Sequence, residues 1–243
     1  MDISFRSRSC GTCFFISAPR YYLKIVSLCS FFMYMSIIRK LKHPFIWLSR
    51  FRNRCGYGVH SPFAFNFITN VIYERLPYYA YRTLPMQERE LARHNKGKMF
   101  FRESRKVSRL LFRLVNMAQP HVIVHVGRRS SAAVYLQAAK TTATYLYAES
   151  FSEVSLNDGM PIDFLFVDAE AALLTPQVLD NLLSRHSLQS IYVFRGIGYG
   201  KEMKACWKKL QDDERTGITF DLYDLGIVFF DKKKLKQHYT VNF

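Results

Sequence analysis

The apolar positions in the second half of the chain fall into short strand-like runs separated by helix-length segments. The runs are bounded by glycine, proline or polar residues and predict buried strands at residues 121–126, 143–148, 162–167 and 190–194. The intervening segments predict helices at residues 128–140, 173–186 and 201–212. Strands that alternate with helices indicate an α/β fold with a parallel sheet.

The end of the chain departs from this alternation. Residues 217–222 and 226–230 read as two strands separated by only three residues. A parallel crossover needs a dozen or more residues, so these two strands must form an antiparallel hairpin. The sequence therefore predicts a sheet of about six strands that finishes with a hairpin.

The first half of the chain is mainly helical. Residues 63–73 carry apolar side chains at helical spacing, and residues 104–117 form a clearer amphipathic helix. The apolar stripe of this second helix contains Val107, Leu110, Leu111, Leu114 and Val115. We expect an N-terminal extension at 1–35, a helical region at 36–118 and an α/β domain at 119–243.

The N-terminal extension has a basic start followed by an apolar run at residues 25–38. That run is shorter than the ~20 residues that span a bilayer, so no stable membrane span is expected. It is similar to a signal peptide but lacks an A-x-A cleavage site. An over-extended reading frame with the natural start at Met33 or Met35 is slightly favoured over an interfacial helix.

The five cysteines are too scattered for a disulfide framework. Cys10 and Cys13 form a CxxC pair with no second pair or histidine cluster near it, which supports a zinc site only weakly. A reduced, cytoplasmic protein is the simpler interpretation.

The net charge of +16 lies entirely in the first half. Residues 1–118 hold 21 Lys and Arg against 5 Asp and Glu, whereas residues 119–243 hold 14 of each kind. Such an asymmetry indicates contact with a polyanion through residues 36–118, or a solvated helical region that keeps the protein soluble. The cations at helical spacing are Arg102, Arg105, Lys106, Arg109 and Arg113.

A glycine turn follows the first predicted strand. Gly127 precedes the predicted helix at 128–140, and Glu149 follows the next strand. Such a turn lets a ligand approach backbone amides, and a carboxylate about 20 residues further on accepts ribose hydroxyls in nucleotide-binding folds. Ser130 could help to hold a phosphate or carboxylate, or it could cap the helix. A plain turn and a solvated Glu149 are the structural alternatives.

Two further residues are candidates for catalysis. Asp168 follows the strand at 162–167, so it lies at the carboxyl edge where such sheets bind ligands. It could act as a base, and no metal site is predicted because no His or Asn stands near it. His60 could serve as an acid or base, or it could be a buried or capping histidine. The glycine-rich loop at 195–200 could approach a substrate or simply form a turn.

The second half resembles the class I S-adenosylmethionine-dependent methyltransferases, especially the small-molecule O-methyltransferases. The resemblance is carried by HVIVHVG, YLYAE, DFLFVDAE and the hairpin ITFDLYDLGIVFF. The strings RCGYGVHSPFAF and KQHYTVNF are also similar to a Bacteroidetes-type group of methyltransferase-like proteins. The resemblance covers residues 36–243 and implies a Rossmann-like sheet with S-adenosylmethionine as cofactor. It further implies Gly127 and Glu149 as cofactor contacts and Asp168 as a residue of the active edge.

The chain departs from this family at two places. The family's first loop reads E/D-x-G-x-x-x-G, but here His125 replaces the acid and no second glycine follows Gly127. Only 13 residues, 150–162, separate Glu149 from Asp163, where the family places a helix, a strand and another helix. A βαβ crossover does not fit in this length, so the adenine half of the pocket must be missing or supplied from elsewhere.

Three hypotheses on function follow. The first is a methyltransferase that acts on an oxygen of a small-molecule substrate. The second is a catalytically inactive descendant with a degenerate cofactor site that serves as a binding or scaffolding protein. The third is a nucleic-acid-binding or envelope-associated protein that uses its basic first half.

Overall fold

The computed structural model describes residues 41–95, 100–154, 160–168 and 174–243. The chain divides into two units, residues 1–45 and 46–243, and every contact given below lies within the second. The predictions on residues 1–35, including the Cys10 and Cys13 pair, lie outside the described residues.

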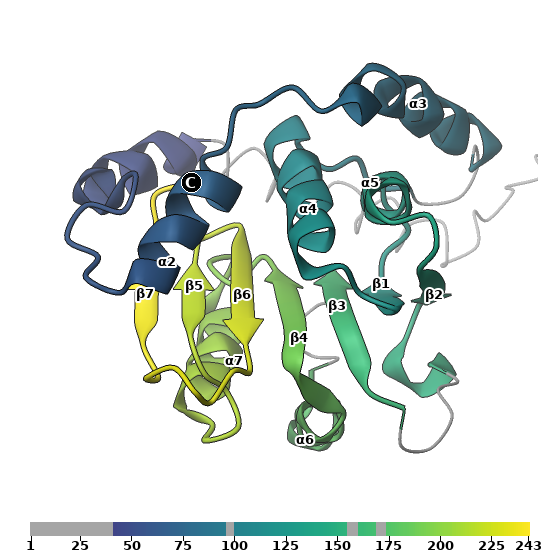
Figure 1. The fold of residues 1–243 in the computed structure, drawn as a ribbon. Coiled ribbons are helices and arrows are strands. Elements are labelled where there is room, and N and C mark those ends of the chain that lie inside the picture. Colours follow the sequence, from purple (N-terminus) through teal and green to yellow (C-terminus); the bar gives the residue numbers. More distant parts are fainter. Residues whose placement is uncertain (1–40, 96–99, 155–159, 169–173) are drawn as a thin grey trace, which may run out of the picture. The chain divides into compact units, whose positions relative to one another are not determined.

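Seven strands form one mixed sheet in the order β2-β1-β3-β4-β6-β5-β7 (Figure 1). They are β1 (Val122–Gly127), β2 (Thr144–Ala148), β3 (Ile162–Asp168), β4 (His186–Arg195), β5 (Thr219–Asp221), β6 (Leu225–Phe229) and β7 (His238–Thr240). Strands β2, β1, β3 and β4 run parallel, and β6 is antiparallel to both β4 and β5. The α/β, Rossmann-like sheet and its closing hairpin are therefore confirmed, with β7 as a strand beyond the six predicted.

Helices cover both faces of the sheet. The helical elements include η1 (Phe51–Asn53), α2 (Pro62–Phe67), η2 (Ile68–Ile72), η3 (Tyr79–Arg82), α3 (Leu84–His94), α4 (Arg105–Ala118), α5 (Ala132–Ala139), η4 (Phe151–Glu153), α6 (Pro176–Ser184) and α7 (Lys201–Asp212). Residues of α2, α4 and α5 pack on one face, and residues of α6 and α7 pack on the other (Figure 1).

Each parallel strand supplies side chains to both cores because successive residues point to opposite faces. In β1, Ile123 faces the α4 layer while Val122 and Val124 face the α6 layer. In β3, Phe164 faces the α4 layer and Leu165 faces the α6 layer. This two-sided burial explains why these strands appear in the sequence as continuous apolar runs.

The local sequence sets the ends of α4. The hydroxyl of Ser104 accepts a hydrogen bond from the amide of Val107 at 3.2 Å, which is an N-cap. At the other end, Gln119 takes a left-handed conformation with φ 48° and Pro120 follows, so the helix cannot continue.

The helix predicted at residues 128–140 begins later, at Ala132. The reason is long-range pairing, because residues 128–131 form a turn that bonds to the segment around Phe101. The amide of Phe101 donates to the carbonyl of Arg129 at 2.8 Å, and the amide of Ser131 donates to the carbonyl of Phe101 at 3.0 Å. Hydrophobic periodicity alone gives no sign of such a contact.

The connection between β2 and β3 contains only the short helical turn η4 in its described part, residues 149–154 and 160–161. Strand β2 is consequently an edge of the described sheet, and β3 is the partner of β1 on the other side.

The opposite edge is closed by the C-terminus. Strand β7 pairs with β5 in parallel, and Val241 and Phe243 are buried after it. The amide of Asn242 donates to the carbonyl of Asn53 at 3.0 Å, which joins the chain end to η1.

Candidate functional site

The turn after β1 brings Gly127 and Asp168 together at the carboxyl edge of the sheet. These two residues are register partners on β1 and β3. Gly127 has φ 116°, a conformation that side-chain-bearing residues rarely adopt. The next amide, that of Arg128, donates to the carbonyl of Asp168 at 3.1 Å. The glycine is therefore required by the turn itself.

Ser130 is buried beside this turn, and its hydroxyl accepts a hydrogen bond from the amide of Ala132 at 3.3 Å. The amides of Ala133 and Val134 donate to the carbonyls of Ser130 and Ser131 at 3.4 and 3.3 Å. Since Ser131 donates to Phe101, all four amides from Ser131 to Val134 have partners within the protein. The first turn of α5 thus differs from helix ends that offer free amides to an anion.

A buried ionic cluster occupies the ends of β3 and β4. Nη2 of Arg128 and Nη1 of Arg195 lie 2.7 and 3.3 Å from the same oxygen of Asp168, Oδ1. Nε of Arg195 lies 2.6 Å from Oε1 of Glu103. The Phe101 ring stacks on both guanidinium groups, with centroid distances of 4.7 and 4.2 Å. Asp168 is therefore held by two arginines under an aromatic ring.

Glu103 has an unusual protonation equilibrium in this cluster. Burial raises its pKa from 4.5 to about 7, and the neighbouring Arg195 opposes the rise. Neither Glu103 nor the guanidinium of Arg195 was a predicted site residue. The sequence indicates these two site residues only weakly. Arg195 ends an apolar strand, but Glu103 lies 92 positions earlier in a basic segment.

Glu149 lies at the end of β2, where it forms an exposed ion pair. Its Oε1 is 3.1 Å from Nε of Arg129, and 64% of the Glu149 side chain is accessible. The guanidinium of Arg129 also lies over the Tyr147 ring, 5.1 Å from its centroid. Strands β1 and β2 pair through Val126 and Ala148, so Gly127 and Glu149 are adjacent in register.

His125, which replaces the acid of the family's first loop, is fully buried. Its Nδ1 is 2.7 Å from the hydroxyl of Tyr145, while its Nε2 has no hydrogen-bond partner among the described residues. Burial lowers its pKa from 6.5 to about 4, so the imidazole is neutral at pH 7. It lines a cavity of about 110 Å³ together with Tyr145, Tyr147 and Ser130.

His60 is exposed and precedes Ser61, the N-cap of α2. Aromatic side chains of α2 pack on β5 and β6, as Phe67 does on Phe220. No hydrogen bond or ion pair within the described residues joins His60 to Gly127, Ser130, Glu149 or Asp168. The structure thus brings Gly127, Ser130 and Asp168 to one turn, with Glu149 beside it, and does not include His60 in this group.

The glycine loop after β4 forms a turn against the hairpin. The amide of Gly196 donates to the carbonyl of Asp224 at 2.6 Å, and the amide of Gly198 donates to that of Tyr223 at 2.9 Å. Gly198 is needed because a side chain there would meet the Tyr223 ring at 2.2 Å. These glycines are explained by packing.

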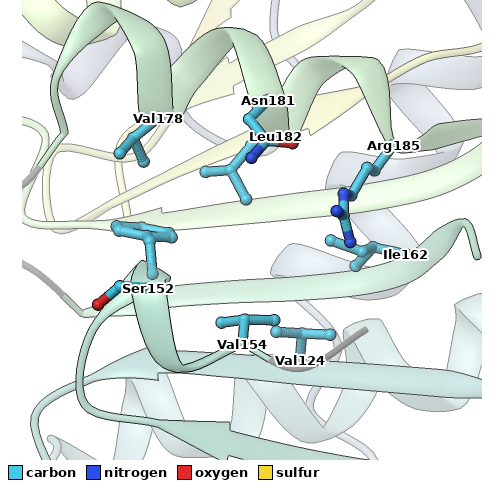
Figure 2. A pocket seen from close by; sticks show the side chains of 9 residues that line it. Val124, Ser152, Val154, Ile162, Val178, Asn181, Leu182 and Arg185 are labelled. Carbon is cyan, nitrogen blue, oxygen red and sulfur yellow. The ribbon is translucent and has the colours of Figure 1, made fainter. Parts of the chain in front are cut away.

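A larger, mostly apolar hollow lies on the α6 face of the sheet, as Figure 2 shows. Its volume is about 240 Å³, and Phe151 and Val154 of the short β2–β3 connection line it. Its lining runs from Ile162, the first residue of β3, and Arg185, just before β4, to Phe151, which follows β2. Neither Gly127 nor Asp168 lines it.

The basic stripe predicted on α4 is only partly available to a partner. Arg113 is buried and donates to the carbonyls of Val71 and Ile72 at 2.6 and 3.0 Å. Nε of Arg102 is 2.6 Å from Oε1 of Glu88. Of the five cations at helical spacing, Arg113 is therefore not available to a partner, because it binds α4 to η2.

Within the described ranges, no helix is both long enough and apolar enough to cross a membrane. The same residues contain no group of three or more His, Cys, Asp or Glu side chains placed to hold a metal ion.

No protein-family model and no curated protein sequence matches the chain. Solved structures similar to it include the SAH-bound methyltransferase PaMTH1 of Podospora anserina, at 12% identity and a TM-score of 0.42 over 65% of this chain and 98% of that one. The O-methyltransferase TomG of Streptomyces achromogenes, in complex with SAM, is similar at 14% identity and a TM-score of 0.41, covering 64% and 91%. The O-methyltransferase of Bacillus cereus, in complex with SAH, is similar at 12% identity and a TM-score of 0.41, covering 65% and 94%.

Proposed function

We propose that this chain is a methyltransferase-like protein that binds S-adenosylmethionine at the carboxyl ends of β1 and β2. The observation that carries the proposal is the adjacency of Gly127 and Glu149, which follow the paired residues Val126 and Ala148. A side-chain-free turn beside an exposed carboxylate is the arrangement that nucleotide-binding sheets use for a ribose. In this proposal Glu149 accepts the ribose hydroxyls, and Gly127 leaves room for the ligand beside it.

The proposed reaction is methyl transfer to an oxygen of a small molecule, in keeping with the branch that the sequence resembles. S-adenosylmethionine supplies the methyl group, so the protein has to orient the acceptor and receive its proton. In this proposal Asp168 holds Arg128 and Arg195 in place, since one of its carboxylate oxygens contacts both guanidinium groups. Glu103, whose pKa is about 7, is better suited to proton exchange at neutral pH. The proposal assigns no step to His60.

A second candidate is a binding protein without transfer activity. Two observations favour it: the amides of the first turn of α5 are bonded internally, and Phe101 covers Arg128 after β1 and Arg195 at the end of β4. In this case the sheet binds a ligand or a partner, and polyanion contact through residues 36–118 would be one such interaction.

Calorimetric titration of the purified full chain with S-adenosylmethionine and S-adenosylhomocysteine tests the proposal. Binding should be lost in Gly127→Val and weakened at least tenfold in Glu149→Gln. Gly58→Val and Glu202→Gln are matched controls, since Gly58 also has a positive φ, 74°, a Cβ there would meet no atom within 4 Å, and Glu202 is an exposed acid of α7. Absence of binding at millimolar ligand overturns the proposal. Binding without methyl transfer to any of a panel of phenols and alcohols supports the second candidate.

A further inference from the structure

Two arginines of α4 face one small cleft. Arg105 and Arg109, one helical turn apart, line a cleft of about 110 Å³ together with Tyr81, Pro85 and Tyr135. No carboxylate is among these lining residues. The cleft therefore concentrates two positive charges and two phenol groups in one place.

Neither arginine of this cleft forms an ion pair within the described residues. Glu88, which accepts from the Tyr135 hydroxyl at 3.4 Å, is bound to Arg102 at 2.6 Å. The guanidinium of Arg109 stacks on Tyr81, 4.7 Å from the ring centroid. Arg105 makes no ion pair or hydrogen bond within the described ranges. Like charges at i and i+4 repel each other on a helix.

The position of Arg105 adds to this imbalance. It is the first residue of α4, directly after the N-cap Ser104, and the first turn contains no acid. The positive end of a helix dipole disfavours cations there and favours anions. A bound anion would thus relieve both the repulsion between the two arginines and the unfavourable position of Arg105.

We propose that this cleft is a binding site for the phosphate group of a small phosphomonoester. Guanidinium groups bind phosphate oxygens through paired N–H donors, which is the reason that arginine predominates in such sites. The two phenols can add donors, because their present hydrogen bonds are long, at 3.4 Å each. Burial raises the pKa of Tyr81 and Tyr135, so both hydroxyls keep their protons at neutral pH.

The size of the cleft favours a single phosphate group. Its volume of about 110 Å³ accommodates a tetrahedral oxyanion between the two guanidinium groups. The rest of the phosphomonoester would extend into solvent.

The neighbouring cations argue against a nucleic-acid track. Arg113, one turn after Arg109, is buried, and Lys106 lies over the Phe243 ring at 4.1 Å. Arg102 is paired with Glu88. A polyanion needs a continuous row of free cations, whereas here two arginines converge on one cleft.

Titration of the full chain with inorganic phosphate and with phenyl phosphate, followed by calorimetry, tests this site. Both probes should bind, and Arg105→Gln/Arg109→Gln should weaken binding at least tenfold. Arg105→Lys should weaken it less, because it keeps the charge but loses the paired donors. Arg52→Gln is the control, since Arg52 is an exposed arginine of η1. Circular dichroism checks that the variants are folded.

Three outcomes would overturn the inference. One is the absence of binding at 10 mM (about a hundred times weaker than a ~0.1 mM site) for both probes. Another is binding that persists unchanged in the double variant. The third is tight, Arg105-dependent binding of a DNA duplex without any binding of phosphate, which would identify a nucleic-acid surface. The site is independent of the cofactor proposal, so titration of the double variant with S-adenosylmethionine should match that of the wild type.

Discussion

The buried histidine of β1 predicts a specific loss of stability in acid. His125 is 0% exposed, and its pKa is lowered from 6.5 to about 4 by burial. The unfolded chain binds a proton near pH 6.5, whereas the folded protein binds it only near pH 4. Stability that depends on the neutral ring is therefore complete above pH 6.5 and is lost as the pH falls toward 4.

The magnitude follows from the two pKa values. Linkage gives a loss of about 2 kcal/mol at pH 5 and about 3 kcal/mol at pH 4 relative to pH 7. Glu103 acts in the opposite direction, because its pKa is raised from 4.5 to about 7. Its contribution is complete below pH 4.5 and is lost as the pH rises through 7. The pH profile of the wild type alone therefore combines two opposed effects.

The difference in free energy of unfolding between the wild type and a His125 variant isolates the contribution of the histidine. His125→Gln retains a side-chain amide that can bond to the Tyr145 hydroxyl and does not titrate. Urea unfolding of wild type and His125→Gln at pH 7, 6, 5 and 4 should show the variant gaining about 3 kcal/mol relative to the wild type across this range. Glu103 is present in both proteins, so its contribution cancels.

The control is His94→Gln, which changes an exposed histidine at the end of α3. This variant should follow the wild-type profile. If the free energies of unfolding of wild type and His125→Gln instead run parallel from pH 7 to 4, then His125 is not held as a neutral buried ring and the reasoning fails. Nitrogen-15 NMR of the imidazole provides a second readout, since a neutral ring should persist at pH 5.

Three further changes test the packing. Asp168→Asn should cost about 3 kcal/mol in urea unfolding, because it removes the anion shared by two arginines; an unchanged midpoint would show that the cluster carries little energy. Arg113→Met should cost about 2 kcal/mol in the same assay, because two buried carbonyls lose their donor. Gly226→Ala should lower the melting temperature and alter the near-UV spectrum of Trp207, since the new Cβ would lie 2.6 Å from that ring. A melting curve identical to that of the wild type would contradict this packing.

The sheet could be predicted because its determinants are local. The strands around Val124 and Leu165 are apolar on both faces, and a three-residue link cannot join parallel strands. The turn at Gly127 was equally visible, since a strand, a glycine and a helix follow one another directly. Periodicity and loop length are sufficient for these features.

The ionic cluster could not be predicted because its members come from four separate segments. Glu103 precedes α4, Arg128 follows β1, Asp168 ends β3 and Arg195 ends β4, and only the folded sheet brings them together. Strand β7 was missed for a related reason. It has three residues with half-exposed or exposed side chains, so its sequence has no apolar run, and its place depends on pairing with β5.

The charge asymmetry of the chain is explained in part by contacts within the fold. Arg50 forms an ion pair with Asp221 on β5 at 2.8 Å, and Arg113 donates to the backbone of η2. Lys106 covers the ring of Phe243 at the C-terminus. Arg50 and Lys106 thus contact the neutral second half, whereas Arg113 is bonded within the first half. Arg105 has no ion pair or hydrogen bond within the described residues, and it lines the inferred phosphate site together with Arg109, so that site is small and local.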